Sequence, residues 1–178
     1  PHYLILTVTK PGDGVGIANR GFDQLPLEAG KAYDASFWAY QAYMGVMWGP
    51  GDQTKPMPLT VRLEGKDGSV LAETKLEVSG RTWTKHTVTL TPSRSDPEAR
   101  FVLLAHEQGA VALDMVSLFP RDTFKHRPKG LRRDLAQTIA DLKPKFVRFP
   151  GGCLVHGPGV RAYYDWKHTV GPVEQRVA

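Results

Sequence analysis

Short apolar runs, each closed by a turn sequence, fill the chain from its start to about residue 119 and limit what it can fold into. The runs are rich in Val, Thr, Leu and aromatic residues, and many alternate with a period of two. Turn sequences such as Pro11–Gly14 and Lys66–Ser69 separate them. Many short strands at this spacing indicate an antiparallel β-sandwich or jelly roll. The expected strands cover residues 3–9, 33–43, 59–64, 70–78, 84–91, 100–106 and 110–118.

The clearest alternation falls in the second of these strands. Successive side chains of a strand point to opposite faces of its sheet. One face is therefore expected to carry Tyr33, Ala35, Phe37 and Ala39, and the other Asp34, Ser36, Trp38 and Tyr40.

The pattern changes after Pro120. Residues 121–127 form a polar linker, and apolar residues then recur at helical spacing between Leu131 and Leu142 until Pro144 ends the helix. A strand over Phe146–Phe149 is expected to follow. Because one helix and one strand cannot form a sheet, their partners must come from elsewhere. The predicted domains are a β-sandwich over residues 1–120 and, over 121–178, a linker followed by half of a βαβ unit.

A single arginine interrupts the apolar run before Pro150-Gly151-Gly152. A charge in such a run is costly unless it is paired or emerges at the strand end. Arg148 stands two residues before the break, so we expect it at the carboxyl end of its strand, where parallel α/β folds build their active sites. Gly151 and Gly152 would let the backbone turn sharply and approach a ligand.

The overall composition excludes several classes of protein. The chain has 178 residues, a net charge of +5, and no apolar segment long enough to span a membrane. The basic residues of 125–133 lack interleaved aromatic residues, so we expect a solvated surface and no nucleic-acid partner. The single Cys153 precludes an internal disulfide, and the histidines lack metal-ligand spacing. No metal and no cofactor are therefore expected. The chain begins at Pro1 without a methionine, and its first expected strand already begins at Tyr3, which favours a piece of a longer protein.

Several motifs, in order along the chain, resemble the α-L-arabinofuranosidases of glycoside hydrolase family 51. They are Asp114–Pro120, Gly130–Leu135, Leu142–Cys153 and Trp166–Pro172. In that family a galactose-binding-like β-sandwich is inserted after the first strand of a (β/α)₈ barrel. The resemblance implies a mainly β fold here, a jelly-roll sandwich followed by one helix and one strand of an incomplete barrel.

The resemblance also implies a reaction, the retaining removal of terminal α-L-arabinofuranosyl groups from arabinoxylan or arabinan. That chemistry uses two carboxyl groups about 5 Å apart, which are glutamates on later barrel strands in the family. After the linker this chain offers only Asp134, Asp141, Asp165 and Glu174, and none matches a catalytic position. We expect no catalytic residue in this segment, which alone should be inactive.

The family's motifs imply substrate-binding roles for a few residues. Arg148 matches an arginine that keeps the nucleophile ionised, although an arginine reaching into solvent is the alternative. Gly151, Gly152 and Cys153 match the loop that lines the arabinose pocket, although a plain turn with a small buried residue would look the same. Trp166 could form an aromatic wall for the sugar or pack in a core.

One position departs from the family pattern. Many relatives have glutamate where this chain has His156, which puts local hydrogen bonding and pH response in doubt.

Two other functions stay open. The sandwich could act alone as a carbohydrate-binding module, with Trp38 and Trp48 stacking on sugars, or it could be purely structural. The expected partners are arabinose-containing plant polysaccharides and the remainder of the barrel. A homo-oligomer and the compartment are left open, with a secreted location favoured.

Overall fold

The structure, a computed structural model, describes residues 2–42, 55–149, 151–159 and 163–176. The described chain divides into two compact units. One comprises His2–Arg133, and the other begins at Asp134. Trp48, a predicted sugar-stacking residue, lies outside the described residues.

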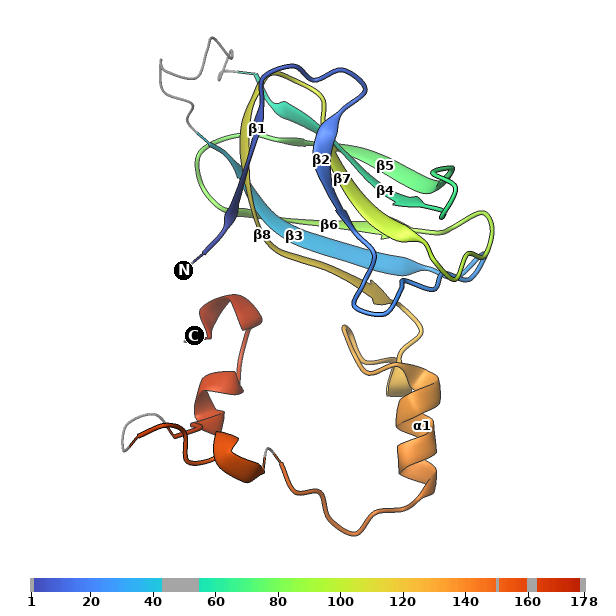
Figure 1. The fold of residues 1–178 in the computed structure, drawn as a ribbon, viewed down its shortest axis with the longest axis vertical. Helices are drawn as coiled ribbons and strands as arrows, with labels where there is room; N and C mark the ends of the chain where they lie inside the picture. Colours follow the sequence, from blue (N-terminus) through green and yellow to red (C-terminus); the bar gives the residue numbers. More distant parts are fainter. Residues whose placement is uncertain (1, 43–54, 150, 160–162, 177–178) are drawn as a thin grey trace. The chain divides into compact units, whose positions relative to one another are not determined.

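The first unit is a sandwich of two antiparallel sheets, each with four strands among the described residues (Figure 1). The strand order of the two sheets, β1-β8-β3-β6 and β2-β7-β4-β5, is that of a jelly roll, which confirms the predicted fold class. The first sheet contains β1 (Leu4–Val8), β8 (Gly109–Pro120), β3 (Tyr33–Gln41) and β6 (Thr84–Leu90). The second contains β2 (Val15–Asn19), β7 (Arg100–Ala105), β4 (Met57–Glu64) and β5 (Val70–Val78).

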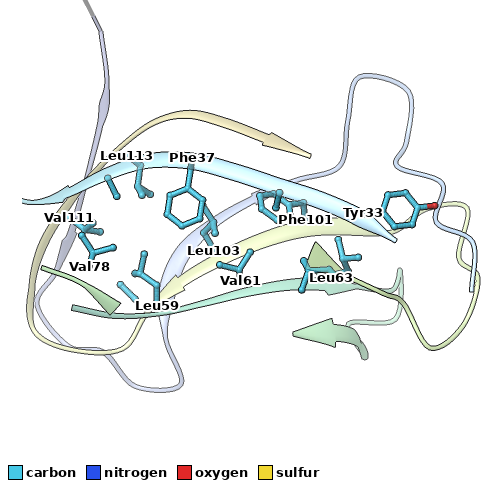
Figure 2. Close-up of a cluster of buried hydrophobic side chains, with 14 of the residues drawn as sticks. Tyr33, Phe37, Leu59, Val61, Leu63, Val78, Phe101, Leu103, Val111 and Leu113 are labelled. Atoms are coloured by element: carbon cyan, nitrogen blue, oxygen red, sulfur yellow. The ribbon is translucent and has the colours of Figure 1, made fainter. Parts of the chain in front are cut away.

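The core lies between the two sheets and is built from their inward-facing side chains. Figure 2 shows Phe37 and Leu113 from one sheet facing Leu59, Val61 and Leu103 from the other. Each of these side chains is almost fully buried. Burying a side chain of this size contributes about 1.5–3 kcal/mol, so this layer is the main source of the sandwich's stability.

Strand β3 confirms the alternation expected from its sequence. Tyr33, Ala35, Phe37 and Ala39 are buried in the core cluster. Asp34, Trp38 and Tyr40 are only partly buried on the opposite face, where Ser36 is buried as well. Polar and aromatic side chains of β3 therefore lie on the outer face of the first sheet.

Strand β2 is absent from the strands expected from the sequence. Its five residues include a glycine and follow a glycine-rich turn, so the run is too short to show a period of two. The strand forms because its whole length pairs with β7, from Val15 opposite Ala105 to Asn19 opposite Phe101.

The second unit holds helix α1 (Arg133–Asp141), which lies within the predicted helix. After the helix Lys143 adopts a left-handed conformation, and Pro144 prevents continuation. Three short 3-10 helices follow, η3 (Gly152–Leu154), η4 (Trp166–Thr169) and η5 (Val173–Gln175). No described helix is long and apolar enough to cross a membrane.

The strand predicted over Phe146–Phe149 does not form. These residues have no regular secondary structure, and Phe146 is 84% exposed. A buried parallel strand needs hydrogen-bonded neighbours on its sheet, and none of the described residues pairs with this segment as a strand. The prediction was therefore wrong for this chain as it stands.

Candidate functional site

Arg148 lies on an exposed part of the second unit. It follows Phe146 and Val147, which are also exposed, and no described carboxylate forms an ion pair with its guanidinium. The guanidinium is therefore available to an anionic group, but the described chain supplies none.

The two glycines of the predicted loop adopt backbone conformations that favour glycine. Gly151 has a φ of 83° and Gly152 a φ of 64°, both in the left-handed region. A Cβ atom built on Gly151 would lie 3.8 Å from the Arg148 Nε, so the turn brings this backbone close to the guanidinium. The sharp turn expected from Gly151-Gly152 is present.

The loop that follows folds back on itself. The backbone N–H of Tyr164 donates to the carbonyl of Val155 at 3.1 Å, and the Tyr164 ring meets Phe149 edge-on at 6.2 Å between centroids. His156 forms a hydrogen bond between its Nδ1 and the carbonyl of Gly157 at 2.9 Å. Tyr164 thus packs locally, and His156 bonds the backbone of its neighbour in the described part of this loop.

Cys153 and Trp166, two further predicted site residues, are exposed. Cys153 lies in η3 with a free thiol, and the Trp166 side chain is 61% exposed at the start of η4. The Asp165 carboxylate caps η4 by accepting from the backbone N–H of Lys167 at 3.0 Å. Trp166 therefore presents its ring to solvent from a short, capped helix.

Two acidic side chains of this unit form local structural hydrogen bonds. Asp141 accepts a hydrogen bond from Gln137 on α1, and Asp165 serves as the cap described above. Within the described residues, His, Cys, Asp and Glu nowhere gather in a group that could hold a metal ion. The structure brings Arg148 and Gly151 together but places no pair of carboxylates beside them.

A pocket of about 490 Å³ lies on the sandwich unit, at the outer face of the first sheet. Its walls come from β3, β6, the end of β8, and the segment after β8. The residues that line it are Asp34, Ala35, Ser36, Thr87, Val88, Thr89, Phe119, Pro120, Arg121, His126, Arg127, Pro128 and Lys129.

A charged network occupies one wall of this pocket. Arg121 donates to both carboxylate oxygens of Asp34, at 3.0 Å from Nε and 2.6 Å from Nη2, and Thr89 donates to the same carboxylate at 2.8 Å. The hydrogen bond from Arg121 holds the pKa of Asp34 below its usual value. Asp34 therefore stays ionised and holds the Arg121 guanidinium in place.

The aromatic residues of the same sheet face gather farther along β3. Tyr3, Tyr40 and Trp83 meet edge-on, with ring centroids 4.6 Å apart for Tyr40 and Trp83 and 5.4 Å apart for Tyr3 and Trp83. Trp38 has the Lys85 ammonium 5.7 Å from its ring centroid. Stacking of a sugar on Trp38 stays a prediction, and the lysine would compete for that ring face.

Sequence reasoning missed the pocket, although one signal was available. The basic residues of 125–133 were assigned to solvated surface, and Lys125, His126 and Lys129 are indeed exposed. All three have positive φ, a conformation that costs a non-glycine residue about 1–2 kcal/mol. The turn residues Arg127-Pro128-Lys129-Gly130 were the only hint that this segment bends back over the sheet.

Comparison with known proteins relates this chain to arabinose-releasing enzymes. A family model described as the alpha-L-arabinofuranosidase 1 domain matches residues 138–178. The chain is 40% identical over 177 residues to an extracellular exo-alpha-L-arabinofuranosidase of Streptomyces chartreusis, covering 93% of this chain and 20% of that protein. It is 37% identical to alpha-L-arabinofuranosidase 1 of Arabidopsis thaliana, covering 93% of this chain and 23% of that protein.

A solved structure extends the match to the fold. The arabinose-bound structure of a family GH51 α-L-arabinofuranosidase superimposes with a TM-score of 0.79 and 30% sequence identity. The match covers 96% of this chain and 27% of that one. The chain thus spans only about a fifth to a quarter of the relatives that it matches.

The fold is a jelly-roll β-sandwich joined to a segment that matches the alpha-L-arabinofuranosidase 1 domain over residues 138–178. The resemblance to the α-L-arabinofuranosidases of glycoside hydrolase family 51 is confirmed, and the chain corresponds to a part of such proteins.

Proposed function

We propose that this chain is part of a retaining α-L-arabinofuranosidase that removes terminal arabinofuranosyl groups from plant polysaccharides. The observation that carries the proposal is the 40% identity to an exo-α-L-arabinofuranosidase over nearly the whole chain. Because that relative is called extracellular, we also propose that the complete protein is secreted. Arabinose-containing polysaccharides such as arabinoxylan or arabinan are the substrates this function requires.

Within that function the chain would supply binding groups, while the catalytic carboxyl groups would come from other parts of the protein. A retaining glycosidase needs a nucleophile and an acid/base about 5 Å apart. Arg148 is exposed, and the Gly151-Gly152 turn is open enough for a carboxylate and a sugar to approach. An arginine beside the nucleophile would lower the pKa of that carboxyl and keep it ionised. Cys153 and Trp166 would contact the sugar from the same unit.

The domain organisation is part of this proposal. The sandwich would be an inserted module over residues 1–120, and residues 121–178 would lead into a (β/α)₈ barrel. The exposed apolar side chains of Phe146, Val147 and Phe149 support a segment that is completed by neighbouring strands. With such neighbours, these residues would form the strand that this chain alone does not form.

The test is hydrolysis of 4-nitrophenyl α-L-arabinofuranoside by the protein from the complete reading frame that contains this chain. We expect that protein to release nitrophenol and to give arabinose with retained anomeric configuration, while the 178-residue chain alone gives none. The Arg148→Lys variant should lower kcat/KM by on the order of 10²-fold, because a lysine ammonium lacks the planar guanidinium fork that would hold a carboxylate at the reacting centre. Lys145→Gln, in the same segment, serves as the matched control.

Two results would contradict the proposal. One is a complete protein without arabinofuranosidase activity. The other is an Arg148→Lys variant that hydrolyses the substrate as fast as the Lys145→Gln control.

A further inference from the structure

The pocket on the outer face of the first sheet has the chemistry of a binding site for an acidic sugar. It is distinct from the Arg148 segment, since all of its walls belong to the sandwich unit. Its volume of about 490 Å³ lies within the range of small-molecule sites.

The segment that closes the pocket is held in a defined conformation. The buried Thr123 hydroxyl donates to the carbonyl of Arg127 at 2.5 Å, and the backbone N–H of Phe124 donates to the carbonyl of Leu131 at 2.9 Å. Three non-glycine residues of this segment have positive φ, a strain that persists only when the surrounding structure imposes it. The pocket wall is therefore built into the fold.

The charges of the lining residues favour an anion. Arg121, Arg127 and Lys129 supply three positive charges, and Asp34 supplies one negative charge, which leaves a balance of two positive charges. Arg121 is committed to Asp34, whereas among the described residues no carboxylate forms an ion pair with Arg127 or Lys129. The neighbouring Asp122 pairs with Arg133 at 3.1 Å and lies 4.0 Å from the Nδ1 of His126. Two cations are thus open to a ligand.

The remaining lining groups match the rest of a sugar ring. The Asp34 carboxylate already accepts from Arg121 and Thr89, and the Ser36 hydroxyl bonds Ser117, but these oxygens and the Thr89 hydroxyl oxygen can each accept a further hydrogen bond from a sugar hydroxyl. Phe119 and Pro120 supply an apolar surface for the C–H face of the ring. A simple inorganic anion would contact only the cations and would use none of these acceptors or the apolar surface.

We propose that this pocket binds a uronic acid unit of an acidic polysaccharide, with Arg127 and Lys129 contacting the sugar carboxylate. The choice of a sugar as the ligand rests on the proposed function, while binding itself requires no hydrolysis. The sandwich would then hold the protein on uronate-bearing chains while arabinose is removed elsewhere.

The experiment is calorimetric titration of the 178-residue chain with a xylo-oligosaccharide that carries one glucuronic acid. The matched probes are the unsubstituted xylo-oligosaccharide of the same length and sodium phosphate. We expect the uronate-bearing probe to bind at least about tenfold more tightly than either one, because a hydrogen bond to a charged group carries about that factor. Raising the salt concentration should weaken its binding.

Variants locate the site. Arg127→Gln and Lys129→Gln should each weaken binding of the uronate-bearing probe by about tenfold. Lys75→Gln removes the same charge from the exposed face of β5 in the other sheet and should leave binding unchanged. Backbone amide shifts of Asp34 and Thr89 on titration supply a second readout that needs no variant.

Each contrary result has a definite meaning. Equal binding of the unsubstituted oligosaccharide, or equal binding of phosphate, would overturn the proposal, as would unchanged affinity in both pocket variants. These outcomes leave the hydrolysis test of the complete protein untouched, so the two proposals can fail separately.

Discussion

Gly16 lies in β2 against the backbone of β7. A Cβ atom at this position would lie 1.7 Å from the carbonyl oxygen of Leu103 and 2.9 Å from the Leu104 Cα. Both contacts are with backbone, which cannot move aside without disturbing the β2–β7 pairing. The glycine is therefore required by the close approach of two strands.

We expect Gly16→Ala to lower the free energy of unfolding by about 2 kcal/mol, because the strand must shift to accommodate the methyl group. Urea denaturation followed by circular dichroism measures this change. Gly159→Ala is the matched control, since no atom lies within 4 Å of a Cβ built there. A Gly16→Ala variant as stable as the control would show that β2 does not pair as described.

His86 is a titratable group inside the sandwich. Its ring stacks on Phe37 with 5.4 Å between centroids, and its Nε2 is buried without a hydrogen-bond partner among the described residues. Burial lowers the pKa of His86 below its usual value, because the charged imidazolium would lose its hydration. The folded protein therefore favours the neutral ring.

The sign of the resulting pH dependence follows from linkage. The unfolded chain binds the proton more readily than the folded chain. The contribution of neutral His86 to the free energy of unfolding is therefore complete above about pH 6.5 and is lost as the pH falls through the lowered pKa. We expect the free energy of unfolding to fall between pH 7.5 and pH 5. The His86→Phe variant should lose this part of the slope, whereas His168→Gln, an exposed control, should keep it. Equal slopes in His86→Phe and wild type would rule out His86 as the source.

Helix α1 exposes the apolar side chains that its sequence pattern gathers on one face. Leu135 and Ile139 are both more than half exposed, and Leu142 follows just beyond the helix. A row of exposed apolar side chains such as this marks a surface that another element covers in a complete fold. The helix is therefore expected to make the isolated chain associate.

The double variant Leu135→Glu/Ile139→Glu should reduce self-association and dye binding of the 178-residue chain. The free energy of unfolding of the sandwich should change by less than about 0.5 kcal/mol, because the replaced side chains are on the surface. Light scattering and fluorescence of a hydrophobic dye measure the effect. Gln137→Glu adds an acidic charge to the same helix and serves as the control. Unchanged scattering in the double variant would mean that another surface drives association.

Elements with a strong local pattern could be predicted, and those that depend on distant partners could not. The alternation of β3 and the apolar spacing of α1 identified both from sequence. Strand β2 depends on pairing with β7, some 85 residues later, and has little pattern of its own. Phe146–Phe149 has a strand sequence but no strand neighbour among the described residues, so pattern alone gave the wrong result there.

The candidate sites follow the same logic. The sharp turn at Gly151 and Gly152 was predictable, because a positive φ depends on the residue itself and glycine adopts it readily. The pocket was not, because it requires Asp34, Thr89 and Arg121 to converge from three elements. The left-handed conformations of Lys125, His126 and Lys129 leave no mark in residue type, since none of the three is glycine.

At the scale of the whole molecule, the sandwich contains its own core. The buried residues of the main cluster all lie between Val8 and Leu113, with Leu118 packed against them. Residues beyond Pro120 also belong to this unit, since the backbone N–H of Arg121 donates to the carbonyl of Ala32 at 2.9 Å. The sandwich should therefore fold without the residues that follow Arg133.

A chain that ends at Arg133 is expected to keep the thermal midpoint of the sandwich within about 3 °C, because it retains the core and the Arg121–Asp34 pair. A chain that ends at Phe119 should melt several degrees lower, since it loses that pair and the segment that closes the pocket. Calorimetric melting of the three chains makes the comparison. If ending the chain at Arg133 lowered the midpoint by more than about 10 °C, the second unit would be part of the sandwich's folding unit. If both shortened chains melted alike, the segment after β8 would add nothing to stability, and the pocket would lack the fixed wall that its proposed ligand needs.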